Sequence, residues 1–97
     1  MASTEAIASA TAAGYSAAIA LDLGDSISVW ADKPLNVGEF VRLQRSNDDG
    51  TTWFNVNDEV YSGVVLSSKC TSQSVSGPGT FRLYKMATNV ATAIYYD

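Results

Sequence analysis

The stretch EFVRLQRSNDDGTTWFNV, Glu39 to Val56, decides the fold of this chain. β-Favouring residues stand on both sides of the loop Ser46-Asn47-Asp48-Asp49-Gly50. Residues of these types tolerate left-handed backbone or hydrogen-bond their own main chain, so they favour a tight connection between two strands. The stretch therefore predicts a β-hairpin, and the rest of the chain is read outward from it.

The loop also carries a recognisable motif. Ser46-x-Asp48-x-Gly50-x-Thr52-Trp53 resembles the Asp-box, S-x-D-x-G-x-T-W, which occurs on hairpins of sialidase-type propellers and many unrelated β proteins. The resemblance implies a turn-stabilising device: the Asp48 carboxylate accepts backbone N–H bonds, Gly50 has a positive φ, and Trp53 packs over the turn. Propellers carry the motif once per blade and this chain carries it once, so a sialidase is not implied.

Alternating apolar and polar residues predict strands before the hairpin. Residues 15–22 alternate with Tyr15, Ile19 and Leu21 on one face, and residues 26–31 alternate with Trp30 facing away from the core. After the hairpin, the sequence predicts an interrupted strand over 61–67, a polar edge strand within 68–76, and strands over 80–86 and 90–96. A second turn is predicted at Ser76-Gly77-Pro78-Gly79.

Seven or eight short strands without a convincing helix are typical of an all-β, antiparallel β-sandwich. Ig-like topology is the first expectation, and a jelly roll is the alternative. The sandwich is expected over residues 15–97 as one domain, which suits a chain of 97 residues. The expected core consists of Ile19, Leu21, Ile27, Val29, Val41, Leu43, Phe54, Val56, Val65, Phe81, Leu83 and Ile94.

Residues 1–14 are almost all Ala, Ser and Thr, and Ile7 is their only large apolar side chain after Met1. Because this segment has little to bury, we expect an N-terminal arm over residues 1–14 that is weakly ordered in isolation. The functional alternative to a mere tail is an arm that becomes ordered against a neighbouring subunit or the capsid shell.

Composition excludes several classes of site. The chain has no His and a single Cys, Cys70, which excludes an intramolecular disulfide, a Ser–His or Cys–His catalytic pair and a Cys/His zinc site. A net charge of −4 with six dispersed Lys and Arg residues argues against a nucleic-acid partner. No apolar run reaches the length of a membrane span, and no basic secretory signal opens the chain. We therefore expect a protein made in the cytoplasm, without a cofactor, a metal or a membrane.

Carboxylates offer the only remaining catalytic or metal chemistry. Adjacent pairs occur at Asp48/Asp49 and Asp58/Glu59, and a polar corner of Asn55, Asn57, Asp58 and Glu59 contains calcium-type ligands. The corner lacks the spacing of an EF-hand, and adjacent carboxylates on turns usually face solvent. The sequence therefore predicts neither a metal site nor an enzyme.

Aromatic side chains left outside the core predict a contact surface. If the expected strands hold, Trp30, Tyr84 and Tyr95 face outward, and aromatic residues are enriched at the centres of protein interfaces. The candidate interface therefore comprises Ile7 of the arm together with Trp30, Tyr84 and Tyr95.

Two segments resemble small virion proteins of tailed bacteriophages: LQRSNDDGTTW, Leu43 to Trp53, and SGPGTFRLYK, Ser76 to Lys85, followed by an apolar strand that ends Tyr95-Tyr96-Asp97. The resemblance implies a non-enzymatic structural protein of the particle. Its first expectation is a capsid decoration, or cement, protein that binds the major capsid protein or another virion protein and forms a homo-oligomer. A tail or neck component is the alternative within this class. A carbohydrate-binding module with Trp30, Tyr84 and Tyr95 as its sugar platform is the alternative outside it.

Overall fold

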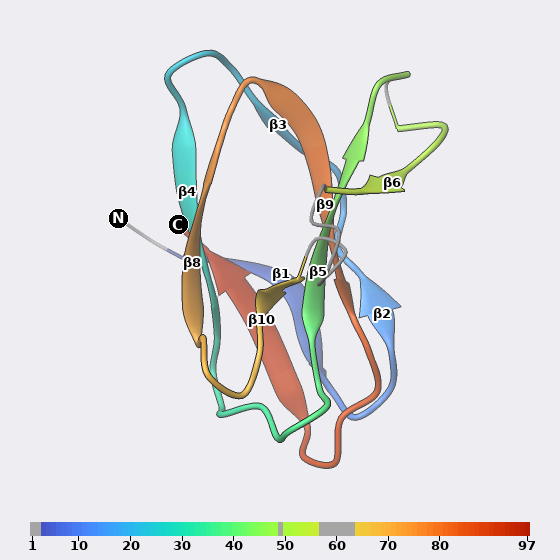
Figure 1. The fold of residues 1–97 in the computed structure, drawn as a ribbon, viewed down its shortest axis with the longest axis vertical. Coiled ribbons are helices and arrows are strands. Elements are labelled where there is room, and N and C mark those ends of the chain that lie inside the picture. The colour runs from blue at the N-terminus through green and yellow to red at the C-terminus, as the bar shows by residue number, and fades with distance from the viewer. Residues whose placement is uncertain (1–2, 49, 57–63) are drawn as a thin grey trace.

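The computed structural model describes residues 3–48, 50–56 and 64–97, and over these ranges the chain is all-β. Two antiparallel sheets form its two layers (Figure 1). The predicted antiparallel β-sandwich is therefore confirmed. No helix occurs in the described part of the chain, and hence none that could cross a membrane.

The four-stranded sheet has the spatial order β1 (Thr4–Ala10), β10 (Thr92–Tyr96), β4 (Ser26–Ala31) and β8 (Ser72–Ser76). At the centre of the six-stranded sheet β9 (Gly79–Lys85) pairs with β5 (Val41–Ser46). β2 (Gly14–Tyr15) and β3 (Ile19–Leu21) both pair with β9, and β6 (Phe54–Asn55) and β7 (Val64–Leu66) both pair with β5.

The strand order is that of a jelly roll. Because β2 and β3 lie along β9 and β6 and β7 lie along β5, each of these pairs acts as one interrupted strand. The described chain then has eight strands: the first, last, third and sixth form one sheet, and the second, seventh, fourth and fifth form the other. Such a double-sheet arrangement is a jelly roll. An Ig-like sandwich would place its first two strands side by side in one sheet, so that first expectation is wrong and the alternative is correct.

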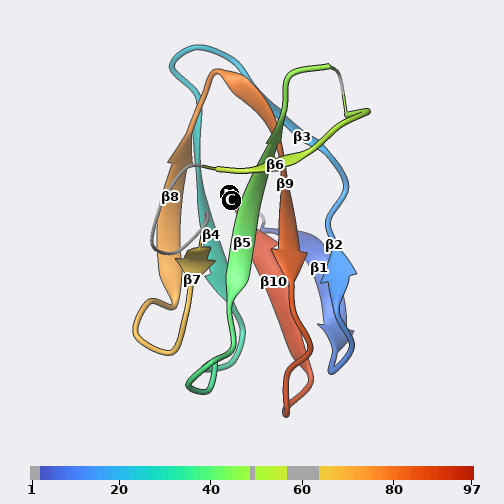
Figure 2. The same cartoon turned by 45° about the vertical axis from the view of Figure 1, so that its right-hand side comes forward.

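A single long hairpin explains this topology. Thr4 pairs with Tyr96, Gly14 with Lys85, Ser26 with Ser76, and Arg45 with Phe54, so the partners are always about equally far from Gly50 along the chain. The chain is thus one antiparallel ribbon wrapped into two sheets, with the turn after β5 at its apex. In Figure 2 this turn lies at the upper end of the molecule, at the same end as the β3–β4 and β8–β9 turns.

The core lies between the two sheets and largely matches the prediction. Eight of the expected core residues are buried, and Ile27, Val56 and Val65 pack against them half-buried. The prediction that Phe54 belongs to the core is wrong. Phe54 is 57% exposed, because it lies on the two-residue edge strand β6 opposite the exposed Arg45. The buried apolar residues absent from the prediction are Ile7, Leu35, Leu66, Val75 and Ala93.

The expectation of a weakly ordered N-terminal arm is also wrong for the residues that the structure describes. Residues 4–10 form β1, which pairs with β10 along the edge of the four-stranded sheet. Its side chains are mostly small, but Ile7 lies opposite Ile94 and is 7% exposed within the core. Backbone pairing with β10 and this one buried side chain supply contacts that the composition of the segment does not reveal.

Candidate functional site: the apex turn and two aromatic faces

The apex turn is held by side-chain bonds to the backbone. The Ser46 hydroxyl donates to Asp48 Oδ1 at 2.7 Å and accepts the backbone N–H of Gly50 at 2.8 Å. Asp48 Oδ1 also accepts the backbone N–H of Thr52 at 2.8 Å, and the Trp53 indole donates to the Gly50 carbonyl at 3.1 Å. Gly50 has a φ of 91°, a conformation that favours glycine. The bond to Asp48 from the backbone, the positive φ of Gly50 and the contact of Trp53 with the turn agree with what the resemblance implied, and the Ser46 bonds are additional.

The Asp48 carboxylate therefore has a structural role. Its bonds from the Thr52 backbone N–H, the Ser46 hydroxyl and the Thr52 hydroxyl hold the pKa of Asp48 below its ordinary value. A carboxyl with a lowered pKa stays ionised near neutral pH and is a poor general acid. Asp49, Asp58 and Glu59, which the sequence placed in acid pairs, lie outside the described residues.

The outer face of the four-stranded sheet carries an aromatic pair. Trp30 of β4 lies directly opposite Tyr95 of β10, and their rings stack at 4.8 Å between centroids with planes 20° apart. The Tyr95 hydroxyl donates to Glu5 Oε2 at 3.4 Å. Burial, followed by the negative charges of Glu5 and Asp32, raises the pKa of Tyr95. The Trp30–Tyr95 pair thus lies in a negative electrostatic environment.

The outer face of the six-stranded sheet carries a second cluster, built around an arginine. The Arg82 guanidinium of β9 lies 4.0 Å from the ring centroid of Tyr15 and 4.7 Å from that of Trp53. Its Nε donates to Gln44 Oε1 at 2.6 Å, and Tyr84 packs on Tyr15 with 4.9 Å between ring centroids. Two cation–π contacts hold this guanidinium, so β2, β9 and the apex turn are joined at one surface.

The structure divides the predicted interface. Trp30 and Tyr95 lie together as expected, but Tyr84 faces outward from the opposite sheet, and Ile7 is buried in the core. The four residues therefore do not form one surface, and the sugar platform expected from Trp30, Tyr84 and Tyr95 is not assembled. The outward orientation of Trp30, Tyr84 and Tyr95 is the part of the prediction that holds.

The sequence pattern missed the role of Tyr15. Its spacing puts it on one face with Ile19 and Leu21, yet Tyr15 is 55% exposed while those two are buried. The cause is the interruption between β2 and β3, where Ser16 turns inward and its hydroxyl accepts the backbone N–H of Leu83 at 2.8 Å. A break of this kind moves the following residues to the other face. The polar Ser16 within an apolar alternation is the only sequence signal of it.

A buried lysine ties the loops at the end opposite the apex. Lys85 is fully buried, and its Nζ donates to the carbonyl oxygens of Ala12 at 2.8 Å and Met86 at 3.3 Å. Burial lowers the pKa of Lys85, and the negative charge of Glu39 acts against that shift. Glu39 in turn accepts the backbone N–H groups of Asn36 and Asn89, each at 2.8 Å, which lowers the pKa of Glu39. These two charged groups connect loops and present no reactive atom at the surface.

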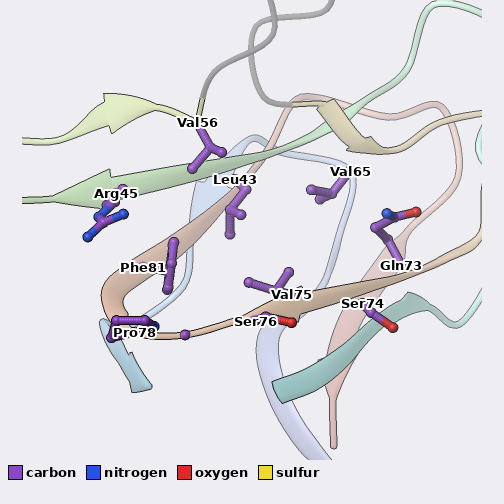
Figure 3. A pocket seen from close by; sticks show the side chains of 11 residues that line it. Leu43, Arg45, Val56, Val65, Gln73, Ser74, Val75, Ser76, Pro78 and Phe81 are labelled. Atoms are coloured by element: carbon purple, nitrogen blue, oxygen red, sulfur yellow. The ribbon is translucent and has the colours of Figure 1, made fainter. Parts of the chain in front are cut away.

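A cavity of about 470 Å³ opens between the sheets beside β8 (Figure 3). Leu43, Val75 and Phe81 form part of its apolar wall, and the guanidinium of Arg45 lies 5.8 Å from the centre of the Phe81 ring at its rim. Two further lining residues, Val56 and Val65, stand on either side of segment 57–63, which lies outside the described residues. We assign this cavity no ligand.

Within the described ranges, no group of three or more His, Cys, Asp and Glu side chains is arranged to hold a metal ion. Most of the polar corner that contains calcium-type ligands (Asn57, Asp58 and Glu59) falls in segment 57–63, outside the described residues, so the expectation of a solvated turn there stays a prediction. Comparison with known protein families, curated proteins and solved structures gives no match to this chain. Its function must therefore be argued from its own residues.

Proposed function

We propose that this protein is a non-enzymatic structural component of a bacteriophage particle, and that it decorates and stabilises the capsid. The observation that carries the proposal is the pair of aromatic clusters, Trp30–Tyr95 and Tyr15–Arg82–Tyr84, on the two opposite outer faces of one small sandwich. Preformed aromatic clusters suit protein contacts, because large rings that are already held in place lose little conformational entropy on binding.

Two further features support the proposal. The segments that resemble tailed-phage virion proteins, residues 43–53 and 76–85, contain the apex turn and the β8–β9 turn with all of β9. Jelly rolls are also common in viral capsid proteins, although lectins and cupins share the fold, so the topology alone does not choose between these classes. The clustered side chains favour a protein partner on both faces.

The test uses a phage that carries this gene and a deletion mutant of it. Purified protein added to heads from the deletion mutant should co-sediment with them to saturation and raise the temperature at which they release DNA. Trp30→Ala should weaken this binding, whereas Ser72→Ala, at the position paired with Trp30, is the matched control. Absence of the protein from purified virions by mass spectrometry would refute the proposal. Recovery with tails alone would support the tail or neck alternative.

A further inference from the structure

The rings of Trp30 and Tyr95 lie in a row of residues that crosses all four strands of the four-stranded sheet. Glu5 of β1 is paired with Tyr95 of β10, and Tyr95 is paired with Trp30 of β4. Ser72 of β8 continues the row beside Trp30. Both rings are half-buried, whereas Glu5 and Ser72 are exposed. Because a serine is too small to cover an indole, the Trp30 ring is accessible on the β8 side.

Two carboxylates act on this ring pair. Glu5 accepts the Tyr95 hydroxyl at 3.4 Å. Asp32, directly after β4, accepts the backbone N–H of Ala93 through its Oδ1 at 2.9 Å, and this bond holds its carboxylate in place. After burial, the negative charges of Glu5 and Asp32 are the next causes of the raised pKa of Tyr95, so both charges lie close to the ring pair.

Asp97 adds a third carboxylate to the same face. Its backbone exchanges two hydrogen bonds with Ser28, at 2.9 and 3.0 Å, so these two residues are paired. Ser28 lies two residues before Trp30 on β4, and alternate residues of a strand share one face. The Asp97 carboxylate accepts the Ser3 hydroxyl at 3.2 Å. Glu5, Asp32 and Asp97 therefore border the ring pair.

No Lys or Arg belongs to the four strands of this sheet. All six of these residues lie in the described ranges, so the rest of the sequence adds none. Four of them belong to strands of the other sheet, and Lys69 lies between β7 and β8. Lys33, in the loop after β4, donates to the Ala91 carbonyl at 3.1 Å. The charged side chains on the four strands themselves are therefore carboxylates.

We propose that this face binds Lys or Arg side chains of a protein partner, which contact the rings of Trp30 and Tyr95 and pair with the carboxylates around them. The faces of aromatic rings and carboxylates attract the same cations, so the two kinds of side chain act together. A basic partner is complementary to this surface, whereas an acidic partner would be repelled. The inference rests on the proposed function for the identity of the partner, a protein of the phage head.

The first experiment uses hexalysine as the probe, added to the isotope-labelled full chain. NMR spectra report the indole N–H of each of the two tryptophans, Trp30 and Trp53, and Trp53→Phe assigns the two signals. Hexalysine should shift the Trp30 signal to saturation, and added salt should reverse the shift because the contact is electrostatic. Hexaglutamate is the control and should cause no shift. A Trp30 signal that hexalysine leaves in place would overturn the proposal.

The second experiment measures binding to heads from the deletion mutant. Glu5→Lys should weaken binding by about tenfold or more, because it places a cation where the partner's cation would lie. Asp22→Lys makes the same change of net charge at an exposed position after β3 and is the matched control. Circular dichroism and melting verify that each variant is folded, and Asp97→Lys replaces Glu5→Lys if the latter is not.

The outcomes separate this inference from the proposed function. Binding of Glu5→Lys to heads with wild-type affinity would overturn the inference and leave the proposed function in place. A wild type that does not bind heads would refute the proposed function, while a shift of Trp30 by hexalysine would still support the cation-binding face. Self-association of the wild type in sedimentation velocity that Glu5→Lys abolishes would make a second copy the occupant and overturn the choice of partner.

Discussion

Asp48 accepts the backbone N–H of Thr52 at 2.8 Å across the turn at which the whole chain doubles back. Strands on both sides of this turn pair outward from it as far as Thr4 and Tyr96. The turn bond therefore lies at the apex of the long hairpin whose arms pair as β5–β6, β4–β8 and β1–β10.

Replacing Asp48 should destabilise the fold. Asp48→Ala removes the acceptor of both the Ser46 hydroxyl and the Thr52 N–H, so the melting temperature and the urea midpoint should fall. Asp48→Asn keeps an oxygen acceptor without the charge and should be intermediate. Asn47→Ala, at the exposed neighbouring position, is the control. Equal midpoints for Asp48→Ala and the wild type would show that the turn bonds contribute nothing to stability.

Stability should also fall in acid, because two carboxylates accept hydrogen bonds in the folded state. The pKa values of Asp48 and Glu39 lie below their ordinary values of 3.8 and 4.5, because backbone N–H groups favour the ionised forms. Groups with lowered pKa stabilise the fold above the unfolded-state pKa, and this contribution is lost as the pH falls through the folded-state pKa. Urea midpoints measured from pH 6 downward should drop below about pH 4.5. The double variant Asp48→Asn, Glu39→Gln should show a flatter profile, and an unchanged slope would contradict the assignment.

The hairpin, the second turn and most strands were predictable from local pattern. Alternation placed Phe81 and Leu83 inside and Arg82 and Tyr84 outside, and the structure confirms these orientations. Turn residues at 46–50 and 76–79 encode local backbone geometry, which depends on few distant contacts. These features are therefore predictable from the local sequence.

The remaining features depend on partners distant in the sequence. Topology was predicted as Ig-like because strand spacing alone does not say which strands become neighbours, and β1 was missed because its partner β10 lies at the other end of the chain. Tyr15 was placed on the wrong face because the alternating pattern continues across the break between β2 and β3, where Ser16 is the single sign of it. The two aromatic faces also come from strands that meet only in the folded sheets.

Removing the buried charge of Lys85 should destabilise the fold. Lys85→Met keeps the length of the side chain but leaves the carbonyls of Ala12 and Met86 without this donor, at a cost of about 1–3 kcal/mol. Lys69→Met, at an exposed position, should stay within about 0.5 kcal/mol of the wild type and serves as the control. The measurement is the free energy of unfolding in urea. A stabilised Lys85→Met variant would mean that desolvation of the ammonium outweighs its bonds.

The N-terminal segment should prove to be part of the folded domain. Ile7 is 7% exposed opposite Ile94, so Ile7→Ala should lower the free energy of unfolding by about 2–5 kcal/mol, and Ile7→Val by about 0.5–1.5 kcal/mol. Ala8→Ser, at the exposed neighbour, should have little effect. Deletion of residues 2–13 also removes the pairing of β1 with β10 and exposes the backbone of β10, so the truncated chain should unfold at a lower temperature or aggregate through that edge. A truncated protein with a wild-type melting temperature would instead support an accessory arm.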